Sequence, residues 1–237
     1  MSARSAKRLE ELRGAYGLSA AQGRQLEGLL ELLAEDEQAP TTVREPVRAV
    51  DVHLADSLAA LTIPAVRDAG RVADIGAGAG FPGLVLAVGL PRATVTLVES
   101  QARKCAFIDG ALTRAAIENA RVVCARAEEW PAVEGAGSQD IVTARALAPQ
   151  PVVLEYAAPL LRAGGVLVDW RGARNEPEEA AARLAADQLG LQLSEIRHVE
   201  PFAAASNHHL HLYLKVRDTP ARYPRRAGIA RKRPLGS

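Results

Sequence analysis

One segment restricts the fold of this chain more than any other. Residues 74–83 read Asp-Ile-Gly-Ala-Gly-Ala-Gly-Phe-Pro-Gly, and their first two residues end the short, mostly apolar run 72–75. Glycine adopts backbone conformations that other residues avoid, so alternating glycines predict a tight turn. Such a turn joins a buried parallel strand to a helix and lets a ligand approach the backbone. The segment therefore predicts an α/β fold with a ligand site at the carboxyl edge of its first strand.

Short apolar runs and helical patterns alternate after this turn. The runs lie at 93–98, 121–124, 140–143 and 165–170, and the helical patterns at 84–89, 104–119 and 154–162. Strands that alternate with helices form parallel βαβ units. Two later stretches, 191–199 and 209–216, alternate apolar and polar residues and predict a closing antiparallel pair. We expect a doubly wound, mostly parallel sheet of seven strands.

Two amphipathic helices are predicted before this region. Residues 18–37 begin with the capping-box spacing Ser19-x-x-Gln22, and residues 46–61 repeat apolar side chains every three or four positions. We expect an N-terminal helical layer over residues 1–66, packed on a core of residues 67–217. A basic tail of residues 218–237 completes the chain.

The charge of the chain is unevenly distributed. It has 29 basic and 28 acidic residues in 237, but seven of the basic ones and only Asp218 among the acidic ones lie in residues 217–237. A basic tail on an acidic body suggests a polyanionic partner. The spacing of Cys105 and Cys124 matches no metal site, and the longest uncharged run, 75–91, carries five glycines and two prolines. We expect a cytoplasmic protein with no metal and no membrane segment.

Two classes of cofactor fit the glycine-rich turn. Gly78, Gly80 and Gly83 have the Gly-x-Gly-x-x-Gly spacing of dinucleotide-binding folds. Glu99 ends the second predicted strand, where an acidic residue binds the cofactor ribose. On these residues alone, an NAD(P)-dependent oxidoreductase is an open alternative.

Other features favour S-adenosylmethionine. The glycines also read as Gly-x-Gly-x-Gly from Gly76, and Asp74 just before them would attract a sulfonium and repel a diphosphate. Pro82 suits the first turn of a helix. Glu128, after the third strand, would accept a hydrogen bond from the adenine amino group, unless it is an ordinary solvated charge.

The edge of the fourth predicted strand carries Arg145, where a methyl acceptor would meet the cofactor. The sequence lacks the Asn/Asp-Pro-Pro-aromatic run typical of adenine amino methylation there, and neither Cys105 nor Cys124 follows a proline, as a cytosine-C5 nucleophile commonly does. An acceptor with an exposed lone pair, such as guanine N7, needs alignment rather than a base or nucleophile. Arg145 would hold the cofactor carboxylate, the guanine or a phosphate, unless it is a merely exposed arginine.

Motifs over most of the chain resemble those of one bacterial family. They are Val43-Arg44-Glu45-Pro46, His53-Leu54-Ala55-Asp56-Ser57-Leu58, the glycine-rich turn with Phe81-Pro82, Leu97-Val98-Glu99-Ser100, Thr143-Ala144-Arg145-Ala146 and Tyr223-Pro224-Arg225-Arg226-x-Gly228. The pattern resembles the 16S rRNA (guanine-N7)-methyltransferase G family, also called the glucose-inhibited division protein B family. Departures from its usual pattern include Trp170-Arg171-Gly172 and Asn207-His208-His209.

The resemblance implies a Rossmann-like, class I S-adenosylmethionine-dependent fold and methyl transfer to N7 of a guanine in 16S rRNA. With the residues of the turn, the predicted cofactor site consists of Asp74, Gly76, Gly78, Gly80, Phe81, Glu99, Ala127, Glu128 and Arg145. The predicted catalytic residues are Arg145, His53 and Asp56, of which the last two lie three positions apart and would form a polar pair on one helical face. The predicted RNA contacts are Arg171, Arg222, Arg225, Arg226, Arg231, Lys232 and Arg233.

The basic tail would follow the phosphates of the RNA, and its alternative is a solubilising end. We expect 16S rRNA, free or in the small subunit, as the partner of a monomeric enzyme. A catalytically silent RNA-binding module is the remaining alternative to a methyltransferase.

Overall fold

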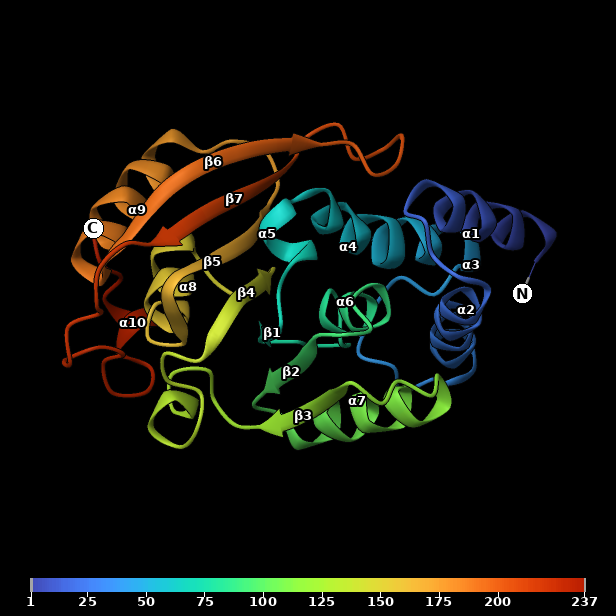
Figure 1. Cartoon of the computed structure of the whole chain (residues 1–237), viewed down its shortest axis with the longest axis horizontal. Helices are drawn as coiled ribbons and strands as arrows, with labels where there is room; N and C mark the ends of the chain where they lie inside the picture. Colours follow the sequence, from blue (N-terminus) through green and yellow to red (C-terminus); the bar gives the residue numbers. More distant parts are fainter. Residues whose placement is uncertain (1, 237) are drawn as a thin grey trace.

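The computed structural model describes residues 2–236 as three layers built around one sheet (Figure 1). The strands are β1 (Arg71–Ile75), β2 (Thr94–Glu99), β3 (Ala120–Cys124), β4 (Gln139–Arg145), β5 (Leu161–Arg171), β6 (Leu191–Val199) and β7 (His208–Lys215). Their order is β3-β2-β1-β4-β5-β7-β6, and β7 is antiparallel to both neighbours while the other pairs are parallel. The predicted doubly wound, mostly parallel sheet of seven strands with a closing antiparallel pair is confirmed.

Helices cover both faces of the sheet (Figure 1). They are α1 (Ala3–Ala15), α2 (Ala20–Glu35), α3 (Pro46–Ala49), α4 (Asp56–Leu58), α5 (Pro64–Arg67), α6 (Gly83–Gly89), α7 (Ala102–Arg114), α8 (Gln150–Ala157), α9 (Glu176–Leu189) and α10 (Ile229–Lys232). The helices up to α7 pack with one face and α8 to α10 with the other.

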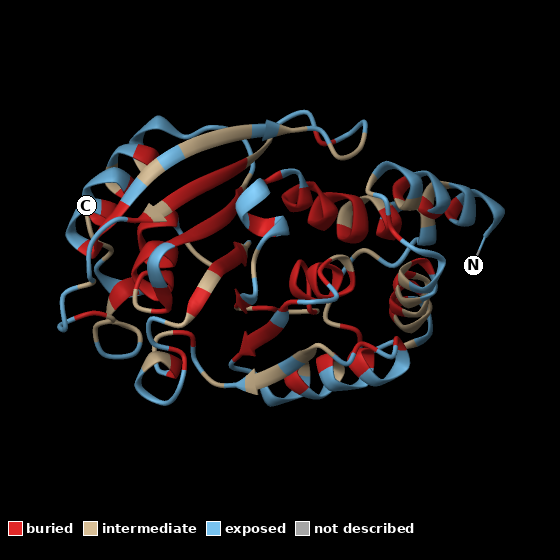
Figure 2. Cartoon of the chain, in the orientation of Figure 1, coloured by how far each residue is buried: buried red, intermediate tan, exposed pale blue. Residues whose placement is uncertain are grey.

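The central strands are buried on both faces (Figure 2). Successive strand residues point to opposite faces, so Val72 and Leu212 join the core under the N-terminal helices. Ala73 and Tyr213 join the core under α8 and α9. Continuous apolar runs in the sequence correspond to this two-sided burial.

The N-terminal helices share their core with the sheet, because Leu9 and Leu26 belong to the same apolar cluster as Val72. The capping box predicted at the start of α2 is present: Ser19 Oγ accepts from the Gln22 N–H, and Gln22 Oε1 accepts from the Ser19 N–H. The domain boundaries at residues 66 and 217 stay predictions, and Met1 and Ser237 lie outside the described residues.

The helical segment predicted over 46–61 is not one regular helix. It runs through α3, a π-helix (Val50–Ala55), α4 and a 3₁₀ turn (Ala59–Thr62). Single π-turns are often found at functional sites, because they change which side chains face a given direction. Both His53 and Asp56 lie at this irregular region.

Two predicted helices differ most from the structure at their ends. The helix expected at 154–162 begins at Gln150, with Pro151 in its first turn, and ends at Ala157, and the one expected at 104–119 ends at Arg114. Pro159, which has no backbone N–H to continue the helical hydrogen bonds, lies between α8 and the long strand β5. Sequence analysis also missed α1 and α9, although Asn175 caps α9 by accepting a hydrogen bond from the Glu178 N–H.

Candidate active site

A cavity of about 640 Å³ lies over the glycine-rich turn between β1 and α6. Its walls include the loop around Thr41, the turn at Gly76 and Gly78, the end of β2 and the end of β4. The φ angles of Gly76 and Gly78 are +67° and +62°, values that favour glycine. A Cβ on Gly76 would lie 2.3 Å from Cδ1 of Leu147, so the glycine allows the two walls to approach.

Glu99 lies at the end of β2 and lines this cavity. Its Oε2 accepts a hydrogen bond from the Gly78 N–H at 3.0 Å, and its Oε1 accepts one from the Gln101 N–H at 2.9 Å. The Ser100 hydroxyl also donates to Oε1, at 3.4 Å, so of the roughly four acceptor sites of the carboxylate one remains, on Oε2, for a ligand hydroxyl group. This arrangement suits the ribose of a nucleoside cofactor.

Asp74 lies behind the turn and not on the cavity wall. Its side chain accepts hydrogen bonds from the Gly83 N–H and the Thr143 hydroxyl, both at 2.9 Å, and the residue is 1% exposed. Burial raises its pKa to about 6, although both hydrogen bonds oppose the shift. The sequence predicts that this carboxylate faces a sulfonium, but in the structure it accepts the first N–H of α6 instead.

This position of Asp74 also bears on the dinucleotide alternative. In dinucleotide-binding folds, the free N–H groups at the start of the helix bind the pyrophosphate. Here the Gly83 N–H already donates to the Asp74 carboxyl group. A diphosphate would lose that donor and approach an acidic group, so the site favours a cofactor without phosphates.

His53 extends from the π-helix to the cavity over the glycine-rich turn, which is called the cofactor cavity from here on. Its ring stacks on Phe81 with centroids 4.6 Å apart and planes 19° apart. Its Nε2 lies 3.1 Å from Thr41 Oγ1 and 3.3 Å from the Val43 carbonyl oxygen, and its buried Nδ1 has no hydrogen-bond partner among the described residues. Burial, helped by the charge of Arg145, lowers the pKa of His53 to about 4, so the ring is neutral at pH 7.

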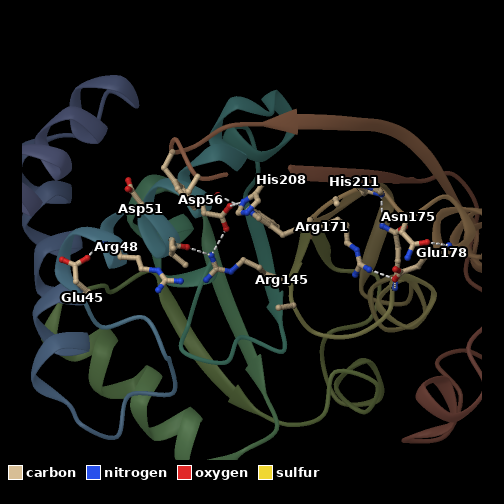
Figure 3. A pocket seen from close by; sticks show the side chains of 18 of the residues that line it. Glu45, Arg48, Asp51, Asp56, Arg145, Arg171, Asn175, Glu178, His208 and His211 are labelled. Carbon is tan, nitrogen blue, oxygen red and sulfur yellow. Dashed lines mark hydrogen bonds and ion pairs between the residues drawn. The ribbon is translucent and has the colours of Figure 1, made fainter. Parts of the chain in front are cut away.

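A second, larger cavity of about 1030 Å³ opens beside the first (Figure 3). Arg48 and Asp51 line it from the N-terminal layer, and Arg171 and Glu178 line it from β5 and α9. Arg145 and Ala146 line both cavities. The end of β4 is therefore the wall that the two cavities share.

Asp56 joins two basic side chains at this wall (Figure 3). Arg145 Nη1 donates to Asp56 Oδ2 at 2.8 Å and to the Val52 carbonyl oxygen at 2.9 Å. His208 Nδ1 lies 3.0 Å from Asp56 Oδ1. The Asp56 side chain is 6% exposed and that of Arg145 is 18% exposed, so this ion pair is largely shielded from water.

The predicted polar pair of His53 and Asp56 does not form within the described chain. His53 faces the cofactor cavity and Thr41, whereas Asp56 faces the larger cavity and Arg145. His53 lies within the π-helix and Asp56 follows it directly, and in a π-helix a spacing of three no longer brings side chains to one face. The irregular helix thus distributes the two residues to different cavities.

Several other predicted cofactor residues lie outside the cofactor cavity lining. Gly80, at φ +90°, packs against Leu84, and Ala127 is buried. Glu128 Oε1 accepts from the Gly228 N–H at 3.3 Å. Their predicted direct contacts with a cofactor therefore have no support in the cavity geometry.

The predicted RNA-binding residues do not form one free surface. Arg225 is paired with the buried Glu155, and Arg231 lines the cofactor cavity. Arg171 is paired with Glu178, and Arg222 lies over the ring of Tyr223. Arg226, Lys232 and Arg233 are exposed.

Sequence reasoning missed other residues of the larger cavity, among them Arg48, Gln150, Trp170, Glu178 and His208. Trp170 Nε1 donates to the Asp56 carbonyl oxygen at 3.1 Å, and so connects β5 to α4. The sequence offers one indication for Trp170 and His208, which is that both lie at the ends of strands, where ligand sites of such sheets are found. Their meeting with Asp56, over more than a hundred residues of sequence, depends on the tertiary fold.

No group of three or more His, Cys, Asp or Glu side chains in residues 2–236 is arranged to hold a metal ion. Across the same residues, every helix is too short or too polar to cross a membrane.

Comparisons with known proteins agree with this geometry. The profile described as rRNA small subunit methyltransferase G matches residues 22–208. Proteins named ribosomal RNA small subunit methyltransferase G from Syntrophomonas wolfei and Rubrobacter xylanophilus are each 39% identical to the chain. The alignments cover 86% of this chain and 96% of the first protein, and 81% of this chain and 75% of the second.

Among solved structures, a SAM-dependent methyltransferase from Aquifex aeolicus is similar with a TM-score of 0.56 at 15% identity, over 71% of this chain and 93% of that one. This likeness supports the class I methyltransferase fold. The matched profile and the relatives, taken with the two cavities that meet at Arg145, show that the chain belongs to the rRNA small subunit methyltransferase G family.

Proposed function

We propose that this protein transfers a methyl group from S-adenosylmethionine to N7 of a guanine in 16S rRNA. The observation that supports this most directly is the shared wall: Arg145 and Ala146 line both the cavity over the glycine-rich turn and the larger cavity beside it. A donor in the first cavity and a nucleobase in the second would meet at this wall. Methyl transfer requires such alignment more than it requires an acid or a base.

The residues of the smaller cavity suit S-adenosylmethionine. Glu99 offers an acceptor to a ribose hydroxyl, and Arg145 offers donors to the methionine carboxylate. The neutral His53 adds no positive charge near a cationic donor. When bound, S-adenosylmethionine supplies a methyl group on a positively charged sulfur that a lone pair can attack.

The chain positions the acceptor without activating it. N7 of guanine carries an exposed lone pair, so no side chain has to remove a proton before attack. We assign to Arg145 the orientation of the reacting groups, with its guanidinium held by Asp56, whose carboxylate is in turn bonded to His208. Trp170 reduces the access of water to this ion pair, because it packs there while only 6% exposed.

The larger cavity has room for a base turned out of its stack. Flipping a base costs a few kcal/mol, and polar contacts to its edge offset the cost. Glu178 and Asp56 provide acceptors for guanine N–H groups, and Arg48 provides a donor for a neighbouring phosphate. We also propose phosphate contacts for Arg171, Arg222, Arg226, Lys232 and Arg233, action as a monomer, and a cytoplasmic location where ribosomal subunits assemble.

The decisive experiment measures methyl transfer directly. The protein is incubated with S-adenosylmethionine labelled in its methyl group, together with 16S rRNA or small subunits from cells that lack the gene. We expect label in N7-methylguanine after digestion to nucleosides and mass spectrometry. Label in a different nucleoside would overturn the position, and binding of both ligands without transfer would favour the silent RNA-binding module.

A further inference from the structure

The C-terminal residues 217–236 are packed against α8 and α9 and are not a free arm. Arg217 Nη2 donates to Asp187 Oδ1 at 2.6 Å, and Thr219 Oγ1 donates to the Leu189 carbonyl oxygen at 2.9 Å. Tyr223 is 8% exposed. Figure 1 shows this segment beside α8 and α9, at the end of the molecule opposite α1.

A buried ion pair holds the middle of this segment. The Glu155 side chain on α8 is 0% exposed, and Arg225 Nη2 lies 2.6 Å from its Oε2. The Arg225 backbone N–H and Nε both donate to Glu155 Oε1 at 2.9 Å. A carboxylate this deeply buried requires its partner, because an unpaired buried charge is very costly.

Beyond this ion pair the chain crosses to the cofactor cavity. The Gly228 N–H donates to Glu128, in the loop after β3, and Arg231 Nη2 donates to the Leu147 carbonyl oxygen, after β4, at 3.0 Å. Arg231 lines the cofactor cavity, together with Leu147. The segment therefore bridges the two loops that follow β3 and β4.

We propose that Arg231 is a cofactor-binding residue, whose guanidinium covers the adenine ring of S-adenosylmethionine. The inference rests on the proposed cofactor. A ribose bonded to Glu99 at the end of β2 would direct the adenine toward Arg231, on the side of the cavity next to the loop after β3, which Gly228 contacts. A planar guanidinium stacks well on an aromatic ring, and a stacked Arg231 would keep the hydrogen bond from Nη2, at its edge, to the Leu147 carbonyl oxygen.

Adenine is also the chemically consistent part of the cofactor for this arginine. A second cation beside the sulfonium would weaken binding, whereas the neutral adenine ring attracts a cation through its π-face. The C-terminal segment therefore has two different surfaces. Arg231 faces the cofactor, whereas its neighbour Lys232 is exposed and lines neither cavity.

The test compares Arg231→Met and Arg231→Lys with the matched control Lys232→Met. Isothermal titration calorimetry on the full chain gives the Kd for S-adenosylmethionine and for S-adenosylhomocysteine, which lacks the sulfonium charge. We expect Arg231→Met to raise both Kd values by about tenfold, from the loss of one stacked cation. Arg231→Lys should raise them by a smaller factor, and Lys232→Met should leave both within about twofold of the wild type.

The two ligands separate the possible roles of Arg231. An effect of equal size on both supports the adenine contact, whereas an effect on S-adenosylmethionine alone would reject it in favour of a long-range charge effect. An unchanged Kd for both ligands in Arg231→Met would overturn the inference and leave the proposed function intact. Failure of the wild-type protein to bind either ligand would instead refute the proposed cofactor.

A second measurement separates the cofactor role from an RNA contact. Fluorescence polarisation with a labelled small-subunit rRNA fragment, without cofactor, should give the same Kd for Arg231→Met and the wild type. A loss of RNA affinity without a loss of cofactor affinity would make Arg231 an RNA contact and overturn the inference. Arg231 is exposed, so the variant should keep the wild-type melting temperature.

Discussion

The side chain of Asp56 accepts two charged or polar donors from different parts of the fold, Arg145 and His208. We expect Asp56→Asn to lower kcat/KM for rRNA by up to about 100-fold, because the guanidinium of Arg145 loses its fixed position. Steady-state methyl transfer measures the loss. The Kd for S-adenosylmethionine should rise by a smaller factor, because Asp56 itself does not line that cavity and acts on the cofactor only through Arg145, which does.

The matched control is Asp51→Asn. Asp51 lies on the π-helix that directly precedes Asp56 and lines the same large cavity, but its carboxylate pairs with Arg8 and not with Arg145. This change removes the same charge and should alter kcat/KM by no more than about threefold, since a partly exposed ion pair contributes little. Equal losses in the two variants would contradict the assigned role of Asp56.

Asp74 supplies a second prediction at this scale. Its pKa rises on folding from 3.8 to about 6, so the folded protein holds a proton that the unfolded chain has lost at intermediate pH. This group therefore lowers stability as pH rises from 3.8 to 6, by about 3 kcal/mol in total. We expect Asp74→Asn to raise the free energy of unfolding by about 1–3 kcal/mol at pH 8, measured by urea titration.

At pH 3.5 the same variant should match the wild type, because Asp74 is then protonated in both states. A stability gain that is equal at both pH values would show that the cause is packing rather than ionisation.

Among the structural elements, the C-terminal segment is joined to α8 by the buried ion pair of Arg225 and Glu155. We expect Arg225→Met to lower the free energy of unfolding by about 3–5 kcal/mol, because Glu155 would remain buried and charged without a partner. The double variant Arg225→Met/Glu155→Gln removes the stranded charge and should recover much of that loss. If both variants are equally unstable, the ion pair is not what holds the segment.

The elements themselves were largely predictable. The strand predicted at 191–199 is exact, and those in the parallel part are right within a residue or two at most ends, because runs such as Val72–Ile75 are buried on both faces. The first part of β5 was missed, since Leu-Arg-Ala-Gly-Gly at 161–165 has no strand periodicity. The tail was read from composition, and composition gives no sign that Arg225 would meet Glu155, 70 positions away.

The site was predictable only where one stretch of sequence contains it. The turn at Gly76 and Gly78, Phe81 and Glu99 all line the cofactor cavity, and the turn was visible as a motif. Asp74 was placed on the wrong side of that turn, because sequence does not show which way a side chain points at a strand end. His208 and Trp170 come together with Asp56 only through the order of the strands.

For the whole molecule, four buried groups determine much of the response of stability to acid. Burial lowers the pKa of His53 and His211 to about 4, and it raises that of Asp74 to about 6 and that of Asp169 to about 7. Between pH 4 and 6.5 the two histidines favour the unfolded state as pH falls, because only there do they bind protons. The two carboxyl groups have the opposite effect over the same range, so the four contributions nearly cancel.

The double variant Asp74→Asn/Asp169→Asn removes the contribution of the carboxyl groups, so the destabilising effect of the two histidines at acid pH should become measurable. Near pH 5.2, the free energy of unfolding of this variant should fall on acidification more steeply than that of the wild type, by about 2.7 kcal/mol per pH unit. This is the slope expected when unfolding no longer releases about two protons from the carboxyl groups. Denaturant titrations at half-unit steps between pH 4.5 and 6.5 measure the slope. Parallel slopes would mean that the carboxyl groups are ionised in the folded protein.

Arg145 forms part of two cavities, and this has a thermodynamic consequence for any pair of ligands that fill them. If the ligand in one cavity changes the Kd of the ligand in the other by some factor, the second ligand must change the Kd of the first by the same factor. This follows because the four binding equilibria form a closed thermodynamic cycle. If a methyl donor tightens the hold on nucleic acid, then nucleic acid must tighten the hold on the donor to the same degree. The demethylated cofactor, which lacks the positive charge, would enter this cycle with a different factor, and the difference sets how far the affinity for nucleic acid changes once the methyl group has left the donor.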